Sequence, residues 1–334
     1  MQTPRPLRIA TRGSQLALWQ ANYVTQLLQK QGITCELNVI KTTGDRVQDR
    51  FLHEIGGKGL FVRELEESLK AGASDLAVHS LKDLPARVPA GFTLAAILPR
   101  HLPQDALIFN PKSLARLKLP AGEHISREQL IALGPLTVAT ASLRRQSLLK
   151  ALPNPIEVVP IRGNVDTRIR KLNEGEWDGL ILAAASLERL GLRDLPHRLI
   201  DSEWFVPCAA QGALAIETLE DSPARTAIAA LSDARTYACA SLERKILEML
   251  GGDCTMPFAA FFDYDAGARK TKGRALVLDD RGQEARVHLT FEGAPETLDL
   301  MASCRATLKA LDGPRLQEIL ARLKITAPDL GHLS

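Results

Sequence analysis

The chain has 334 residues, which is too long for one compact core and predicts two or three domains. Charged residues make up 24% and apolar residues 45% of the sequence, an ordinary globular composition that excludes wholesale disorder. The formal net charge of +3 is too small to indicate nucleic-acid binding by itself, so the local grouping of charges is more informative.

Five cysteines are scattered along the chain without CxxC spacing. Their odd number and their spacing fit reduced thiols better than a disulfide framework or a zinc site, so no metal is expected. The first residues contain no apolar segment of the secretory kind, and no run approaches the length of a membrane span. The sequence therefore predicts a cytoplasmic protein.

The first two-thirds of the chain alternates short apolar strands with amphipathic helices. Up to residue 98, strands are predicted at 7–11, 33–40, 75–80 and 93–98, and helices at 14–32 and 59–72. Ser14 is the expected N-cap of the first helix, and Gly32 is expected to end it. The polar stretch 41–57 between the second strand and the second helix reads as a mobile loop.

The alternation resumes after Asp105. Strands are predicted at 106–109, 136–140, 156–161 and 178–185, and helices at 142–152, 164–175 and 186–191. This repetition predicts parallel α/β sheets with right-handed crossovers, in which ligands bind beyond the carboxyl ends of the strands. The segment 119–134 looks like a surface excursion.

The pattern changes near Pro223. A long helix over 234–252 precedes alternating strands at 256–262, 274–280 and 285–291, and two more helices close the chain. This part reads as a separate α+β domain.

Three turns place arginine beyond a strand end and beside the start of a helix, and a further arginine lies in the next helix. These residues are Arg12 with Ser14; Ser142 with Arg144 and Arg145; Arg162 with Arg168; and Arg189. Guanidinium groups pair with carboxylates or phosphates, and the first turn of a helix adds partial positive charge. One such turn is weak evidence, because a structural ion pair explains most lone arginines, but three together predict a site for a polyanionic ligand.

Two polar stretches allow more than one interpretation. Lys82 and Asp83 follow an apolar strand, where the carboxylate could perform acid–base chemistry or cap a helical turn, and spacing alone favours the cap. His79 reads as a hydrogen-bonded core or strand-end histidine. In GGKGLF (56–61) a glycine follows the lysine, so the phosphate-loop pattern fails; Phe61 is a core anchor or a stacking ring on a glycine-hinged loop.

Cys254 lies in a glycine-flanked turn, GGDCTMP, between the long helix and a strand. No His–Asp arrangement near it in the sequence suggests a cysteine hydrolase. Without further context, it reads as an inert thiol.

Taken together, these stretches resemble the porphobilinogen deaminase family closely. The matching segments are 8–20, 56–61, 77–85, 140–146, 162–168, 187–192, 211–217 and GGDC at 251–254, in the family's order and over nearly the whole chain. The resemblance implies two α/β domains like those of periplasmic binding proteins, facing each other across a cleft, and a C-terminal α+β domain that carries the cysteine. Their expected bounds are 1–103 with 205–222, 104–204, and 223–334.

The resemblance also implies a transferase of tetrapyrrole biosynthesis, a hydroxymethylbilane synthase. Members carry a covalent dipyrromethane, here matched to a thioether at Cys254. They condense four porphobilinogens head to tail with loss of ammonia and release hydroxymethylbilane by hydrolysis. The implied partners are porphobilinogen and the growing oligopyrrole chain, with no nucleic acid or membrane, and the implied state is a monomer.

Residue roles follow from the same resemblance. Asp83 matches the catalytic carboxylate. Contacts to the cofactor are implied for Lys82, Asp83, Ser142, Arg144, Arg145 and Arg162, and contacts to substrate for Arg12, Ser14, Gln20, Phe61, Arg162, Arg168, Arg189 and Gln211. The sequence departs from the family pattern at Asp253, where glycine is common, at Ala141, where serine is frequent, and in a longer stretch around 112–133.

Two other functions fit part of this pattern. A binding protein for an anionic solute would share the two-lobed architecture, but it leaves Cys254 without a role and would be expected to carry a signal peptide. Nucleic-acid binding through the arginines is disfavoured because aromatic residues, at 4%, offer few stacking platforms.

Overall fold

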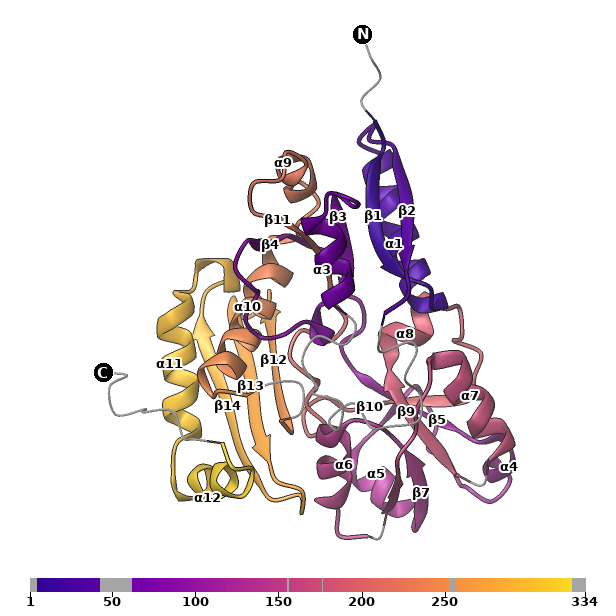
Figure 1. Ribbon diagram of the computed structural model, residues 1–334. Coiled ribbons are helices and arrows are strands. Elements are labelled where there is room, and N and C mark those ends of the chain that lie inside the picture. The colour runs from indigo at the N-terminus through magenta and orange to yellow at the C-terminus, as the bar shows by residue number, and fades with distance from the viewer. Residues whose placement is uncertain (1–4, 43–61, 155, 176, 253–255, 326–334) are drawn as a thin grey trace. The chain divides into compact units, whose positions relative to one another are not determined.

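The computed structural model describes residues 5–42, 62–154, 156–175, 177–252 and 256–325. Phe61 and Cys254 lie outside these ranges, as do Asp253 and most of the predicted loop 41–57. The described residues form three β-sheets with flanking helices (Figure 1). The chain divides into two compact units, residues 1–101 with 213–237 and residues 102–212 with 238–334. The three-domain division expected from the sequence stays a prediction.

The first unit contains a five-stranded sheet of order β2-β1-β3-β11-β4. The strands are β1 (Leu7–Arg12), β2 (Cys35–Ile40), β3 (Leu76–Ser80), β4 (Phe92–Ile97) and β11 (Leu214–Leu219), and the helices are α1 (Gln15–Gln29), α3 (Arg63–Lys70), the short 3-10 turn η2 (Leu81–Asp83) and α9 (Arg225–Ala229). β1 pairs in parallel with β2 and β3, whereas β11 runs antiparallel to both β3 and β4. The strand β11, from the part of the chain that returns to this unit, thus completes the sheet.

Helix α1 illustrates why the sequence folds in this way. The Ser14 hydroxyl accepts a hydrogen bond from the Ala17 amide at 3.3 Å, which confirms the predicted N-cap. Ala21, Val24 and Leu28 recur at helical spacing and are fully buried in the core beneath the sheet.

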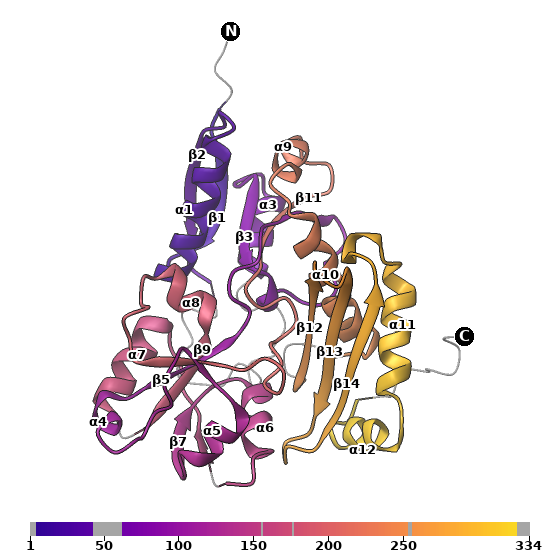
Figure 2. The same cartoon turned by 180° about the vertical axis from the view of Figure 1, so that it is seen from behind.

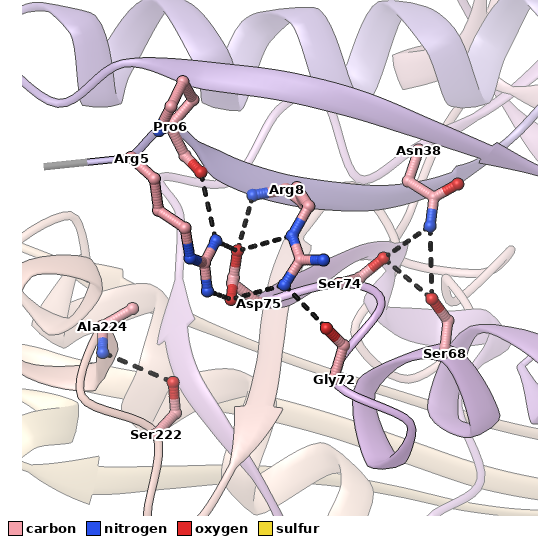
Figure 3. Close-up of polar contacts among 10 residues, drawn as sticks. All are labelled: Arg5, Pro6, Arg8, Asn38, Ser68, Gly72, Ser74, Asp75, Ser222 and Ala224. Atoms are coloured by element: carbon pink, nitrogen blue, oxygen red, sulfur yellow. Dashed lines mark hydrogen bonds and ion pairs between the residues drawn. The ribbon is translucent and has the colours of Figure 1, made fainter.

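A polar cluster fastens the first sheet at the amino-terminal ends of β1 and β3 (Figure 3). Both terminal nitrogens of Arg5 donate to the Asp75 carboxylate at 2.7 Å, and the backbone N–H of Arg8 donates to the same group at 2.8 Å. The side chain of Asn38, from β2, donates to the Ser74 hydroxyl at 3.0 Å. The turn before β3 is therefore tied to β1 and β2 by side chains as well as by the sheet.

The second unit contains a six-stranded sheet of order β6-β10-β5-β9-β7-β8. The strands are β5 (Asp105–Phe109), β6 (His124–Ile125), β7 (Leu136–Ala139), β8 (Ile156–Val159), β9 (Gly179–Ala183) and β10 (His197–Ile200); the helices are α4 (Pro111–Leu114), α5 (Arg127–Ala132), α6 (Leu143–Lys150), α7 (Val165–Glu174) and α8 (Ala184–Arg189). β7 is parallel to β8 and β9, but β5 is antiparallel to β9 and β10.

The expectation of wholly parallel sheets is therefore wrong. β5 and β11 each follow a point where the chain passes from one unit to the other, at residues 102 and 213. The parallel, right-handed rule governs strands joined by a crossover helix within one sheet, and these two strands enter their sheets without one. Their direction is consequently not fixed by the local strand–helix alternation.

The segment 119–134 is also not a surface excursion. It supplies the edge strand β6 and the helix α5, and Ile125 and Leu130 are fully buried. A capping box between Ser126 and Gln129 starts α5 and directs Leu130 into the core. Two buried side chains among many polar neighbours are too few to reveal this packing by periodicity.

The C-terminal part forms an antiparallel sheet of β12 (Phe258–Asp265), β13 (Lys270–Leu278) and β14 (Glu284–Glu292). Its helices are α10 (Ala234–Met249), α11 (Leu300–Leu311) and α12 (Pro314–Arg322), with a short turn η3 (Pro295–Thr297). Figure 2 shows α11 and α12 beside β14. These elements match the predicted order of helix, three strands and two helices.

Both faces of β12 pack into buried cores. Phe258, Ala260 and Phe262 share a core with the helices α10, α11 and α12. Ala259 and Phe261, which alternate with them along β12, share a core with side chains of the second sheet and α6 instead. The second and third sheets consequently belong to one compact unit. Among the described helices, none has the length and apolar character to cross a membrane.

Candidate functional site

The predicted arginines of the second unit follow the carboxyl ends of three neighbouring strands. Ser142, Arg144 and Arg145 come after β7, Arg162 and Arg168 come after β8, and Arg189 lies in α8 after β9. Because β7, β8 and β9 run in parallel, these ends lie at one edge of the sheet. The structure thus brings together at one edge the arginines that the sequence had grouped by pattern alone.

Arg144 and Arg145 share one carboxylate. Arg144 Nη2 donates to Asp105 Oδ2 at 2.8 Å, and Arg145 donates to Asp105 Oδ1 from Nη2 at 2.6 Å and from Nε at 2.9 Å. The side chains are 4%, 7% and 0% exposed, so all three charges are buried. Two guanidinium groups and one carboxylate leave one positive charge that is not balanced within the trio.

The local sequence does not predict Asp105 as a partner of the arginines, because its position depends on strand direction. Asp105 is the first residue of β5, and in a parallel sheet it would lie at the opposite edge from the arginines. Since β5 is antiparallel to β9, Asp105 pairs with Ala183 at the carboxyl end of β9. One sequence signal could have indicated it: Asp105 directly precedes the apolar run ALIF. Burying an unpaired charge there would be strongly unfavourable, so a positively charged partner is expected.

Further contacts hold each arginine of the pair. Arg144 Nη1 donates to the Val206 carbonyl at 2.8 Å, and Arg145 Nη1 donates to the Ile181 carbonyl at 3.0 Å. The Arg144 guanidinium also lies 5.6 Å from the centre of the Phe205 ring. Burial lowers the pKa of Arg145, and the Asp105 carboxylate opposes that shift. Arg145 remains protonated at neutral pH, as arginine does in proteins.

Ser142 and Gln211 complete the surroundings of the pair. Ser142 is the N-cap of α6, and its hydroxyl accepts from the Arg145 amide at 3.5 Å. The Gln211 side-chain amide donates to the Pro103 carbonyl at 2.7 Å and to Asp105 at 3.1 Å. Gln211 therefore connects the segment before β5 with the segment after β10.

The turn after β8 requires glycine. Gly163 has φ +111°, and a Cβ there would lie 2.7 Å from the Thr167 methyl carbon. The compact turn lets Arg168 Nε donate to the Gly163 carbonyl at 2.7 Å, while Lys171 Nζ donates to the Arg162 carbonyl at 3.3 Å. Both contacts are to the backbone of the RGN turn, and they order this strand end.

Arg189 is buried, and its Nη2 donates to the Gly212 carbonyl at 2.7 Å. It thus holds the segment that leaves the second unit. The sequence resemblance implies a substrate contact for Arg189, which stays a prediction. The structure shows the contact of Arg189 with the Gly212 carbonyl.

In the first unit the predicted residues also lie at strand ends. Arg12 ends β1, and Lys82 and Asp83 lie in η2 directly after the parallel strand β3. Asp83 is exposed and is the last residue of η2, whose N-cap is Ser80, so the alternative in which Asp83 caps this turn is wrong. Gln20 is buried and donates to the Ser80 hydroxyl at 2.8 Å.

His79 is a hydrogen-bonded core residue, as predicted. Its Nε2 lies 3.0 Å from Glu217 Oε2, and both side chains are buried within the sheet. Phe61 and Cys254 fall outside the described residues.

The fold and the strand-end residues define a class: an α/β protein whose arginines gather at the carboxyl ends of parallel strands and whose exposed aspartate lies in a turn beyond another such end. The family model of the porphobilinogen deaminase dipyrromethane cofactor binding domain matches residues 7–227. The chain belongs to the porphobilinogen deaminase family, which confirms the family suggested by the sequence motifs.

Relatives match over almost their whole length. Porphobilinogen deaminase of Ralstonia nicotianae is 41% identical and covers 98% of this chain and 94% of its own. That of Albidiferax ferrireducens is 40% identical and covers 93% of this chain and 99% of its own. Among solved structures, substrate-binding domain 2 of GlnP from Lactococcus lactis covers 75% of this chain and 92% of its own, with 10% identity and a TM-score of 0.41. At this level of likeness the solved structures add no argument, and the α/β class is established by the sheets described above.

Proposed function

We propose that this protein is a hydroxymethylbilane synthase that condenses four porphobilinogen molecules head to tail, with loss of ammonia, on a dipyrromethane held by Cys254. The observation that carries the proposal is the buried Arg144–Asp105–Arg145 trio at the edge where β7, β8 and β9 end, in a chain whose matching domain binds dipyrromethane. Hydrolysis then releases hydroxymethylbilane, and the dipyrromethane stays attached.

The residues present fit a ligand rich in carboxylates. Each pyrrole ring of this chemistry carries one acetate and one propionate, so the bound chain is a polyanion. Within the described residues, Arg144 Nε is buried and has no hydrogen-bond partner, although the rest of that guanidinium is fixed. A charge-assisted hydrogen bond contributes roughly 1.5–3 kcal/mol, so several such donors together hold a polyanion that would otherwise repel itself.

The cofactor and Asp83 have separate tasks in this proposal. When bound, the dipyrromethane supplies the primer to which pyrrole units are joined. Asp83 offsets the positive charge left when ammonia departs from porphobilinogen, and it accepts the proton released by the pyrrole carbon that forms the new bond. It is exposed beyond β3 and so accessible to substrate. General acid–base catalysis of this kind contributes about 10²–10⁴-fold in rate.

The remaining assignments extend the same proposal. Lys82, Ser142, Arg144, Arg145 and Arg162 bind cofactor carboxylates; Arg12, Ser14, Gln20, Phe61, Arg162, Arg168, Arg189 and Gln211 serve the incoming ring and the growing chain. Ser14 and Gln20 already make structural hydrogen bonds, to the α1 amide and to Ser80, so their contribution includes ordering the strand end. A cytoplasmic monomer is part of the proposal.

Intact-protein mass spectrometry tests the covalent cofactor. We expect a mass above that of the sequence by two condensed pyrrole units, and we expect the excess to vanish in Cys254→Ser. Cys304→Ser is the matched control: Cys304 is fully buried, and burial raises the pKa of its thiol to about 12, so it is a poor nucleophile. An excess that survives in Cys254→Ser would overturn the assignment.

Turnover of the same preparations tests Asp83. Asp83→Asn should retain the mass excess and lose about 10²–10⁴-fold in the rate of ammonia release. Near-normal ammonia release by this variant would remove Asp83 from catalysis. A protein that binds porphobilinogen reversibly, without mass excess or turnover, would instead indicate a binding protein for an anionic solute.

A further inference from the structure

We propose that Asp105 is a positioning residue of the cofactor site: its carboxylate fixes the guanidinium groups of Arg144 and Arg145 in the orientation that receives a ligand carboxylate. The inference rests on the proposed function, because it assigns the arginine pair to dipyrromethane. It concerns the second unit alone, in which all three residues lie.

The contacts to Asp105 are numerous for one side chain. It accepts from Arg144 Nη2, from Arg145 Nε and Nη2, and from Gln211 Nε2, at 2.6–3.1 Å. Its exposed fraction is 0%, so no solvent competes for these hydrogen bonds. Since a lone buried carboxylate is strongly unfavourable, its presence in a fully enclosed place is explained by the two guanidinium groups that it holds.

Each guanidinium is held from two sides. Asp105 binds both, the Val206 carbonyl binds Arg144, and the Ile181 carbonyl binds Arg145. A flexible arginine loses rotamer freedom when it grips a ligand, but these two have lost it already in the folded protein. The orientation of the pair is therefore set before any anion arrives.

The pair still keeps donors for a ligand. A guanidinium has five N–H groups. Arg145 uses Nε, Nη1 and Nη2 in the described contacts and Arg144 uses Nη1 and Nη2, so N–H groups of both remain, including the buried Arg144 Nε. Asp105 therefore orients the two guanidinium groups without using all of their N–H donors.

If Asp105 served only to balance charge, its removal would have the opposite effect on the binding of ligand carboxylates from the effect expected of a positioning residue. If Asp105 only offset positive charge, its removal would leave two uncompensated guanidinium groups and strengthen the attraction for carboxylates. If it positions them, its removal lets two like charges move apart and weakens the grip. Retention of the cofactor in Asp105 variants separates the two roles.

The experiment is cofactor occupancy by intact-protein mass in Asp105→Asn, Asp105→Glu and wild type, with thermal unfolding of each. We expect occupancy to fall about tenfold or more in Asp105→Asn. Misplaced guanidinium groups would hold the pyrrole units poorly while the bond to Cys254 forms, and a misplacement of the order of 1 Å can slow a reaction by about 100-fold. Asp105→Glu keeps the charge but moves the carboxylate by one methylene, so it should fold and still lose occupancy.

Asp178→Asn is the matched control. Asp178 is also a buried aspartate of the second sheet: it accepts from the Ser113 hydroxyl at 2.7 Å and the Thr137 amide at 2.9 Å, and it contacts Arg116. It directly precedes β9, whereas Asp105 lies at the other end of that strand. Asp178→Asn should lower the melting temperature of the protein and leave cofactor occupancy at the wild-type level.

The outcomes separate the inference from the proposed function. A wild-type protein without the mass excess would overturn both. A wild-type protein with the excess, together with full occupancy in Asp105→Glu or Asp105→Asn, would overturn the positioning role alone. Equal losses of occupancy in Asp105→Asn and Asp178→Asn at equal loss of melting temperature would reduce Asp105 to a structural residue.

Discussion

Asp75 shows how one side chain links pH to stability in the first unit. The hydrogen bonds from the Arg5 guanidinium, followed by those from Arg8, hold the pKa of Asp75 well below its usual range, although partial burial opposes them. The carboxylate joins the segment before β1 to the turn before β3 (Figure 3). A depressed pKa in the folded state means that the ionised form stabilises the fold.

We expect Asp75→Asn to lower the free energy of unfolding at pH 7 by roughly 0.5–1 kcal/mol, a modest effect because the Arg5 partner is largely exposed. The contribution is complete above the unfolded pKa of about 3.9 and is lost as the pH falls from there towards the folded pKa. Urea titrations of both proteins between pH 3 and 7 measure the difference. Asp221→Asn, at an exposed position of the same unit, should show no such convergence; a difference for Asp75→Asn that grows on acidification would contradict the prediction.

Other single residues could be predicted where their role is local. The Ser14 cap and the hydrogen-bonded His79 both depend on neighbours in one helix or one sheet position, and both were predicted. Asp105 depends on the direction of a strand that the local sequence does not encode, so it was missed. The ligand contacts of Asp83 and the arginines stay predictions.

At the scale of elements, the order of strands and helices followed from the sequence, while strand direction did not. Hydrophobic periodicity is a local property and located β7, α6, β8 and α7 in turn. The antiparallel placement of β5 and β11 depends on where the chain leaves and re-enters each unit, which is a property of residues far apart in sequence. The buried part of 119–134 was likewise decided by packing.

The turn between β13 and β14 carries a prediction at this scale. Gly282 has φ +83°, and a Cβ there would lie 2.6 Å from the Ala151 amide nitrogen at the end of α6. Lys150 Nζ also donates to the Asp280 carbonyl at 3.0 Å beside this contact. Because backbone cannot yield as a side chain can, Gly282→Ala should cost about 2–4 kcal/mol of unfolding free energy, combining overpacking with backbone strain.

Gly122→Ala is the control for that variant. Gly122 also has a positive φ, +93°, but nothing lies within 4 Å of a Cβ added there. It should cost about 1 kcal/mol from backbone strain alone. Chemical denaturation measures the unfolding free energy of both variants. Equal losses of unfolding free energy would show that the close approach of the turn to α6 makes no contribution.

At the scale of the whole molecule, the first unit is built from two separated stretches of chain. β11 lies between β3 and β4, so residues 1–101 alone lack the strand that joins β4 to the rest of the sheet. The exit and return points are adjacent, since the Leu98 amide donates to the Leu214 carbonyl at 3.0 Å. Residues 102–212 of the second unit are therefore inserted between neighbouring strands of the first.

We expect a fragment of residues 1–101 to lack cooperative unfolding. A chain in which a short glycine-rich linker joins residue 101 to residues 213–237 should regain it, because the linker then replaces residues 102–212 with a hairpin connection between β4 and β11. Far-UV circular dichroism during heating measures both. Cooperative melting of the 1–101 fragment would show that β11 is dispensable.

The insertion of β11 also sets an order of events during synthesis. β1 to β4 leave the ribosome first, yet β4 finds its partner only after more than a hundred further residues have been made. At about 5–20 residues per second this delay is roughly 5–25 s, during which β3 and β4 present unpaired edges. All strands of the second sheet, β5 to β10, are translated within that interval. The first sheet begins to be made first, but it is completed after the sheet that carries Arg144 and Arg145. Slower translation before residue 219 would lengthen the time for which the unfinished first sheet can misfold.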